Sequence, residues 1–330
     1  MSETSVEPET LAAAPANGGG GAARRSTPRA GSSGLSRIWR MAWMNVLLSY
    51  RVKIAFFFTF VWPMMFFFVY FVFFAGSKPL TVAALFGPLI SFEILSNALF
   101  GFSSQLVSMR ERDMLRRYHL APISATTMVG SRMLSSYLLF LPLVVLQYLL
   151  AMWWFQMPVR GNLLVLFLVF TLAFLALSAI GLVVACIVDT FQEATVWNQI
   201  LFFGLLFLTG TTLPLLQLPQ AIQRLALFLP PTLMILSSAM VMLGGTGWGP
   251  NWAEIIGLLL IMFSCWGLGV ALFRWEKEKK SSARDRRRAA LALVPILAVG
   301  LWLNLSPGFQ RVYQSYLQES AAAFTAAVKK

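Results

Sequence analysis

The chain has 330 residues, of which 58% are hydrophobic and 12% are charged, and its formal net charge is +13. Soluble domains are usually about a quarter charged, so this composition excludes an ordinary soluble protein. The excess of Lys and Arg does not indicate nucleic-acid binding, because these residues cluster at the edges of long apolar stretches. There the anionic inner leaflet of a membrane accounts for them. We therefore expect membrane lipid, and no nucleic acid, as a partner.

The N-terminal part of the chain divides into a polar tail and an amphipathic segment. Residues 1–36 are mostly Ala, Gly, Ser, Pro, Thr, Glu and Arg, which predicts a disordered cytoplasmic tail. After Ser36, a helix N-cap, one helical face carries Ile38, Trp39, Ala42, Trp43, Val46 and Leu47, with Arg37, Arg40 and Arg51 opposite. This pattern predicts an interfacial amphipathic helix on the inner leaflet. The alternative is that the segment extends the first span downward.

Six apolar stretches are long enough to cross a bilayer, at about 20 residues per crossing. They are Ile54–Phe74, Leu80–Ser108, Leu134–Phe155, Leu163–Val188, Ala194–Leu213 and Ile255–Phe273. Basic residues number seven before the first stretch, five in the loop after the second and eight after the sixth, whereas the three loops on the other side carry one each. Positive loops stay in the cytoplasm, so this asymmetry predicts a cytoplasmic N-terminus.

Two further segments are apolar but short. Between the fifth and sixth spans, four prolines (Pro214, Pro219, Pro230, Pro231) punctuate a region that ends in Thr232–Leu243. An apolar stretch of about 12 residues is more typical of a re-entrant or interfacial segment than of a span. Ala289–Leu305 predicts a seventh span of marginal length, which would place the tail from Ser306 outside. The expected organisation is a tail at 1–36, a transmembrane domain at 37–275, and a basic cytoplasmic linker, extra span and tail at 276–330.

The sequence lacks the motifs of several enzyme classes. It contains no Gly-rich phosphate loop ending in Gly-Lys-Ser/Thr, so we do not expect it to bind ATP in that manner. It has no His-Glu-x-x-His, and the single histidine, His119, lies in a predicted cytoplasmic loop. Cys186 and Cys265 lie in apolar segments without metal-ligand partners and are interpreted as small buried hydrophobes. We therefore expect no catalytic residues, metal or cofactor in this chain.

The loop between the second and third spans has an unusual charge pattern. From Met109 to Ser124 it interleaves acidic and basic residues, breaks at Pro122 and ends in Ser124, a potential cap for the next helix. This order predicts a short charged helix that docks another protein. The alternative is an ordinary positive-inside loop, which explains the arginines but not Glu111 and Asp113.

These residues carry a resemblance to a known family. Glu111, Arg112, Leu115, Arg117, Pro122, Ile123 and Ser124 occupy the pattern of a loop in the ABC-2 type (type 2 ABC exporter) permeases. Many members have Gly-Thr just before the leucine, where this chain has Asp113 and Met114. The motifs Leu213-Pro214, Leu218-Pro219 and Leu229-Pro230-Pro231-Thr232 look like the outer re-entrant region of the drug-exporter-like branch. The amphipathic helix before the first span is similar to the family's connecting helix.

The resemblance implies an all-α polytopic membrane protein with a six-helix core, an amphipathic interfacial helix, a cytoplasmic coupling helix, an outer re-entrant segment and a seventh C-terminal span. It implies a permease subunit in the bacterial cytoplasmic (inner) membrane that exports a hydrophobic small molecule, lipid or glycan precursor. The implied partners are a second copy or a related permease and a separate ATP-binding subunit, which holds ATP and Mg. The implied coupling residues are Arg110, Glu111, Arg112, Asp113, Arg116, Arg117, Pro122 and Ser124.

Glu93 is the only acid that the predicted spans place well inside the membrane. A charged group there is costly and marks either a function or a buried partner. Glu93 is interpreted as a polar contact in the transport path or at a dimer interface, with a structural carboxyl as an equal alternative. Two other functions stay open: an ion-coupled secondary transporter that uses Glu93, and a membrane assembly protein without transport.

Overall fold

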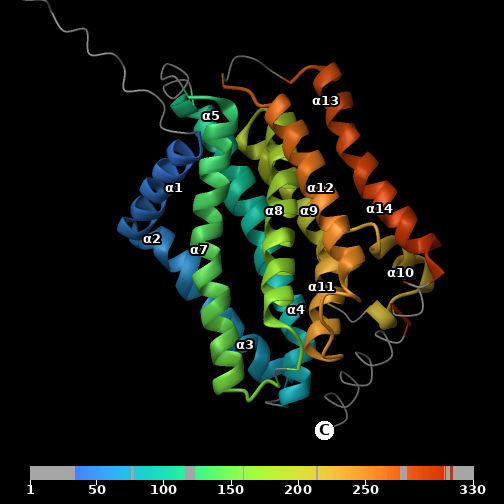
Figure 1. Ribbon diagram of the computed structural model, residues 1–330. Helices are drawn as coiled ribbons and strands as arrows, with labels where there is room; N and C mark the ends of the chain where they lie inside the picture. The colour runs from blue at the N-terminus through green and yellow to red at the C-terminus, as the bar shows by residue number, and fades with distance from the viewer. Residues whose placement is uncertain are drawn as a thin grey trace, which may run out of the picture.

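The computed structural model describes residues 34–75, 78–115, 123–158, 160–212, 215–275, 281–307, 309 and 313–314. These residues form a bundle of long, roughly aligned helices, with no strand among them (Figure 1). The expected all-α polytopic membrane fold is confirmed, because six helical segments are long and apolar enough to span a bilayer.

The first two spans agree with their predicted limits. The first span is a continuous helix made of α2 (Lys53–Phe56), η1 (Phe57–Val61), α3 (Trp62–Tyr70) and η2 (Phe71–Ala75). The second span is made of α4 (Pro79–Ser96), η3 (Asn97–Ser103) and α5 (Ser104–Glu111). The elements η1, η2 and η3 are wider π-helical turns inside these spans. Such turns re-aim the side chains that follow them and are common at functional sites.

The third and fourth spans are long helices with side-chain caps. Helix α7 (Ala125–Trp153) begins where the side chain of Ser124 accepts a hydrogen bond from the Thr127 backbone, so the predicted cap is confirmed. The helix therefore starts well before the predicted Leu134. Helix α8 (Leu163–Ile187) is capped by Asn162 and matches its predicted range.

Helix α8 forms the centre of the bundle and packs closely on its neighbours. It lies between α7 and α12 (Trp252–Ala271), and it also contacts the second span (Figure 1). At Gly181 the second span approaches so closely that a Cβ would lie 2.5 Å from the Ala98 carbonyl oxygen. On the other side, a Cβ at Gly269 of α12 would lie 2.6 Å from Leu182. Small residues of this kind let membrane helices approach each other at backbone distance.

Helix α1 (Gly34–Arg51) is a separate amphipathic helix. The extended backbone of Val52 divides it from the first span, which contradicts the alternative of one continuous helix. Its Ala42 and Val46 are buried, and α1 packs along α7. Trp39 and Trp43 are half-exposed and stack at 6.3 Å between ring centroids. This arrangement fits a helix that lies in a membrane interface.

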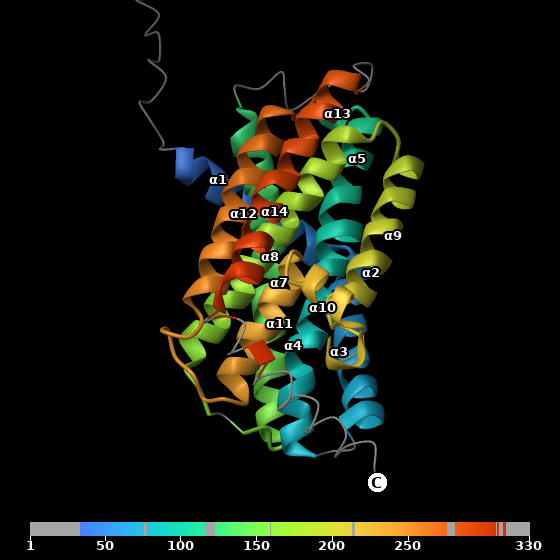
Figure 2. The ribbon, with the colours of Figure 1, turned by 90° about the vertical axis from the view of Figure 1, so that its right-hand side faces the viewer.

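The helix found at the position of the predicted fifth span differs from the prediction. Helix α9 (Phe191–Leu208) is shorter than predicted. It is not among the six segments that are long and apolar enough to span a bilayer. The reason is composition, because its first half carries Gln192, Glu193, Asn198 and Gln199. Figure 2 places α9 along one edge of the bundle.

The proline-rich region forms a bent pair of helices, a shape that fits both the predicted re-entrant segment and a broken span. Helices α10 (Gln220–Ala226) and α11 (Pro230–Met242) meet at a bend of 93°. Pro219 precedes α10, and Pro230 and Pro231 form the first turn of α11, where proline costs no hydrogen bond. Every residue of α11 is buried.

The predicted seventh span is longer than its apolar stretch. Helices α13 (Ala283–Ala289), η5 (Ala290–Ala292) and α14 (Leu293–Leu305) form one segment that passes as a span, Ala283–Leu305. A capping box between Ser282 and Asp285 starts it. The segment runs from the end of the bundle where α5 ends towards α10 (Figure 2). We call the end that contains the end of α5 and the start of α13 the basic end.

Candidate functional site

Polar residues at the basic end connect the loop after the second span to helix α8. Arg110, near the end of α5, is only 5% exposed. Its guanidinium donates to the Ala185 carbonyl at 2.9 Å and to the Val188 carbonyl at 2.5 Å. These are carbonyls of the last turn of α8, which have no partner within the helix and carry the negative end of its dipole. Arg110 therefore lies inside the protein and fixes α5 to the end of α8.

A second arginine, which follows α12, contacts the same end of α8. Arg274, after α12, donates to the Asp189 carboxylate at 2.8 Å and to the carbonyls of Cys186 and Val188 at 2.8 and 3.0 Å. Ser281 donates to the same carboxylate through its backbone and its hydroxyl, at 2.9 and 3.1 Å. We call Arg110, Asp189, Arg274 and Ser281 the junction.

The junction keeps Asp189 ionised. Its partial burial works against the charge, but hydrogen bonds from Arg274 and Ser281 outweigh burial and hold the pKa of Asp189 below its ordinary value. Arg286 of α13 lies 3.8 Å from the same carboxylate and is largely exposed, so it adds little.

The next residues of the loop turn outward. The Glu111 carboxylate accepts a hydrogen bond from the Phe191 backbone, at 3.3 Å, at the start of α9. Arg112 and Asp113 follow and are exposed, and Asp113 has φ of +56°. Gly tolerates this left-handed conformation best and Asp better than most residues.

The remaining predicted coupling residues divide into two groups. Ser124 caps α7 at the far end of the loop. Arg116, Arg117 and Pro122 lie outside the described residues. The predicted helix from Met109 is interrupted, because α5 ends at Glu111 and helical backbone resumes at Met114. Among the charged coupling residues that the structure describes, Arg112 and Asp113 are the ones that are exposed to solvent.

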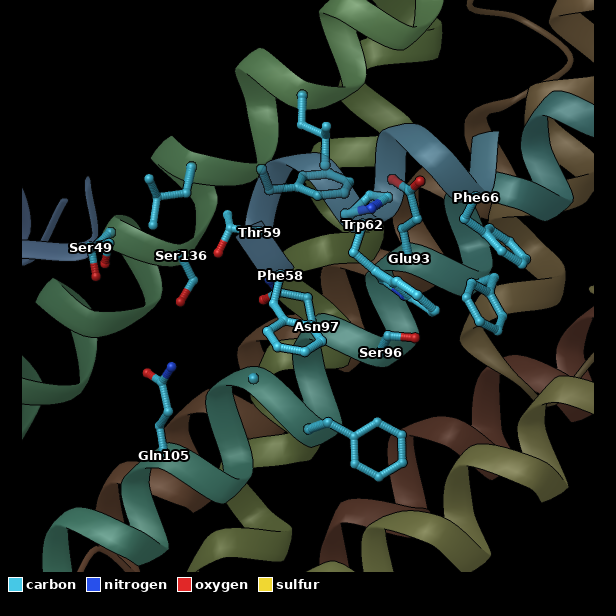
Figure 3. A pocket seen from close by; sticks show the side chains of 18 of the residues that line it. Ser49, Phe58, Thr59, Trp62, Phe66, Glu93, Ser96, Asn97, Gln105 and Ser136 are labelled. Carbon is cyan, nitrogen blue, oxygen red and sulfur yellow. The ribbon is translucent and has the colours of Figure 1, made fainter. Parts of the chain in front are cut away.

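A cavity of about 580 Å³ lies on the other side of the second span (Figure 3). Its walls come from the end of α1, the first span, the second span and α7. They mix aromatic and polar side chains: Ser49, Phe58, Thr59, Trp62, Pro63, Phe66, Phe92, Glu93, Ser96, Asn97, Phe100, Gly101, Gln105, Arg132, Ser135, Ser136, Leu139, Phe140 and Leu143. The volume falls within the usual range for sites that bind a small molecule.

Glu93 lies in the wall of this cavity. It is 7% exposed, and its Oε1 accepts a hydrogen bond of 2.6 Å from Gln147 of α7. Gln147 is itself buried and also reaches the Pro63 carbonyl of the first span, at 3.5 Å. Glu93 thus joins three spans through one polar cluster. The structure places it both in a cavity and on a structural partner, so neither interpretation from the sequence is excluded.

The predicted outer re-entrant region is fixed by a buried hydrogen bond. Thr232 is buried and donates to the Thr209 carbonyl at 3.4 Å. Pro219, Pro230 and Pro231 begin the two helices of the bend, and Pro214 lies outside the described residues. None of these residues lines the cavity.

One buried acid was missed by the sequence analysis. Glu254, in the first turn of α12, is fully buried, and none of the described residues donates a hydrogen bond to either of its carboxylate oxygens. The predicted sixth span began at Ile255, one residue too late to include it. Glu93 is therefore not the only buried acid in the described helices, although Glu254 does not line the cavity.

Comparison with known proteins gives one family. Residues 36–243 match the family model described as ABC-2 type transporter. No curated protein and no solved structure gives a significant match to the chain.

Proposed function

Since that match covers more than half of its length, the chain belongs to the ABC-2 type transporter family, and we propose that it is the permease subunit of an ATP-driven exporter. In this proposal two permeases, identical or related, form the membrane part. A separate subunit binds ATP with Mg and hydrolyses it. The basic end faces the cytoplasm of a bacterial cell, as the excess of Lys and Arg favours.

The observation that carries the proposal is the attachment of the loop after the second span. Arg110 fixes its first residues to the end of α8, and Glu111 contacts the start of α9. The exposed Arg112 follows directly. A partner that moves Arg112 would therefore move the ends of three helices together, because a short hydrogen-bonded link transmits a displacement that a flexible loop would absorb.

The cavity supports a hydrophobic or amphiphilic substrate. One wall of the cavity is the first span. Only 11% of the most apolar part of this span, Phe57–Phe74, is buried within the chain. A ligand enters such a site from the lipid or from the inner interface without crossing the core of the bundle. The proposed cargo is a hydrophobic small molecule, a lipid or a glycan precursor, moved out of the cytoplasm.

The test begins with purification of the protein from its native membranes, followed by an ATPase assay. We expect a stoichiometric ATP-binding subunit to copurify. Arg112→Glu should reduce substrate-stimulated hydrolysis at least about tenfold, because it reverses an exposed charge in the contact. Arg284→Glu reverses an exposed charge at the same end, outside the loop, and should leave hydrolysis unchanged. A homo-oligomer without ATPase activity, or full coupling in Arg112→Glu, would contradict the proposal.

Glu93 favours a second candidate, an ion-coupled secondary transporter, because intramembrane acids commonly form part of ion pathways. Transport in proteoliposomes that contain the permease alone, driven by an ion gradient and abolished by an ionophore, would support this candidate. Transport that requires ATP and the second subunit would exclude it.

A further inference from the structure

Two residues of the cavity wall carry a buried hydrogen-bond acceptor that no described residue satisfies. Oε2 of Glu93 and Oδ1 of Asn97 are buried, and no donor among the described residues reaches either atom. The two residues lie one helical turn apart on the second span, and both line the cavity (Figure 3). Oε1 of Gln147, behind Glu93, is a third buried acceptor without a donor among the described residues.

Acceptors of this kind need a donor from another molecule. A buried polar group without a hydrogen bond costs about 1–3 kcal/mol, and more when it is charged. When Glu93 is ionised, mid-membrane burial makes its charge expensive, so a positive donor compensates it better than a neutral one. The second span therefore offers a place for a cation that carries N–H groups.

The surroundings of Glu93 suit an apolar body attached to that cation. Phe66 of the first span stacks on Phe92 of the second, with 4.8 Å between ring centroids. Trp62 and Phe58 continue the aromatic wall, and Figure 3 shows Trp62 and Phe66 beside Glu93. Aromatic faces attract cations and bury hydrocarbon.

The positive charge in the cavity wall lies away from Glu93. Arg132 lines the cavity from α7, and it lies 15 residues before Gln147, the partner of Glu93, which is about 22 Å along the helix at 1.5 Å per residue. On the second span, Gln105 lies about 18 Å from Glu93 by the same measure. The wall thus has a basic and polar part towards the basic end and an acidic, aromatic part deeper in the bundle.

We propose that the cavity binds lipophilic cations that bear at least two N–H donors, namely protonated primary or secondary amines on an aromatic or aliphatic body. The ammonium group donates to Glu93 and Asn97, and the apolar body packs against Trp62 and Phe66. This assignment names the substrate class of the exporter and rests on the proposed function only for the statement that the bound amine is transported.

The binding experiment uses the full chain in lipid nanodiscs without nucleotide, with empty nanodiscs to correct for partitioning into lipid. Three probes share one ring system: protonated 1-naphthylmethylamine, its N,N,N-trimethyl quaternary analogue and the neutral 1-naphthylmethanol. We expect the amine to bind at least about tenfold more tightly than either analogue, because only the amine supplies both charge and N–H donors. Equal affinity for the amine and the alcohol would overturn the proposal, and equal affinity for the quaternary analogue would overturn its donor requirement.

Two variants locate the site. Glu93→Gln keeps the shape and the contact with Gln147, and should weaken amine binding about tenfold to a hundredfold without changing the affinity for the alcohol. Glu254→Gln makes the same change at the other buried acid, away from the cavity, and should leave amine binding unchanged. Equal losses in the two variants, or no loss in Glu93→Gln, would overturn the site. If gel filtration shows that Glu93→Gln does not fold, the affinities of the unchanged chain for the three probes still test the proposal.

The outcome is independent of the test of the exporter. Amine binding without an ATPase partner would leave the site in place and remove the exporter. A coupled ATPase with no preference for the amine would retain the exporter and remove the assignment of lipophilic cations.

Discussion

The junction and the cavity are two polar regions of a largely apolar bundle, and they differ in how their carboxylates are paired. In the junction, Arg110, Asp189 and Ser281 form hydrogen bonds with residues of other helices. In the cavity, Glu93 and Asn97 each keep a buried oxygen that no described residue reaches. Satisfied networks rigidify a fold, whereas unsatisfied groups in a cavity lower stability until a ligand pairs them. The comparison therefore supports a structural role for the junction and the proposed binding role for the cavity.

The largest effect is expected from Arg274→Ala. This change leaves the Asp189 carboxylate without its closest cation and the Cys186 carbonyl without its side-chain donor, whereas the Val188 carbonyl keeps its bond from Arg110. Removing one partner of a buried pair is strongly destabilising, and we expect a loss of about 3 kcal/mol in chemical unfolding in detergent. Arg284→Ala, at an exposed arginine, should change stability by less than about 0.5 kcal/mol. Similar stability of the two variants would refute the structural role of the junction.

A smaller loss is expected at the contact between α8 and the second span. Gly181→Ala forces a methyl group against the Ala98 carbonyl, which is backbone and cannot move alone, and should cost about 2 kcal/mol. The matched change is Gly204→Ala in α9, where no atom lies within 4 Å of the new Cβ. That variant should gain up to about 1 kcal/mol, because Ala restricts the unfolded chain more than Gly. Equal effects at the two glycines would show that α8 is not tightly packed.

Asn97→Ala should have an effect of opposite sign to the junction variants. The change removes a buried acceptor that no described residue satisfies, and Ala favours helix over Asn by about 0.6 kcal/mol. We expect the ligand-free protein to unfold at equal or slightly higher denaturant concentration. A loss above about 1 kcal/mol would mean that Asn97 is a structural residue, and the contrast between the two regions would fail.

The smallest effect on stability is expected from the titration of Asp189, which changes stability only at acidic pH. The pKa of Asp189 in the folded chain lies below its ordinary value of 3.8, so its ionised form stabilises the fold above that pH. This contribution is lost as the pH falls through the lower, folded pKa. The difference in stability between the natural chain and Asp189→Asn should therefore stay constant from pH 7 to about 4 and shrink only below it. Unfolding titrations at several pH values test this, and a difference that shrinks near pH 6 would contradict the assignment.

Local sequence patterns predicted most of the helices. Hydropathy gave the first four spans, and the prolines at Pro219, Pro230 and Pro231 predicted the bend between α10 and α11. The Ser124 cap was also predictable, because capping depends on residues within one turn. The fifth span was predicted less well, because it was expected at Ala194–Leu213, whereas α9 begins at Phe191, ends at Leu208 and has a polar first half.

The partners of the polar residues could not be predicted in the same way. Arg110 was expected to contact another protein, yet its acceptor Val188 lies 78 residues further along the chain. The sequence alone does not show that α5 and α8 end side by side. Glu93 was recognised because a mid-span acid is rare, but its partner Gln147 was not, because an amide inside an apolar helix carries no signal of direction. Glu254 was missed through an error of one residue in a helix boundary.

The packing of Tyr313 has a consequence for the order in which the protein is assembled during synthesis. Its buried ring closes a small apolar cluster with Leu227 and Leu236, and its hydroxyl donates to the Gln223 carbonyl, 90 residues earlier. While the ribosome is still translating α12, the bent pair α10–α11 therefore lacks one of its walls. Until α14 and Tyr313 emerge, lipid or an insertion factor must cover this surface, and a stalled or truncated chain would expose it to degradation.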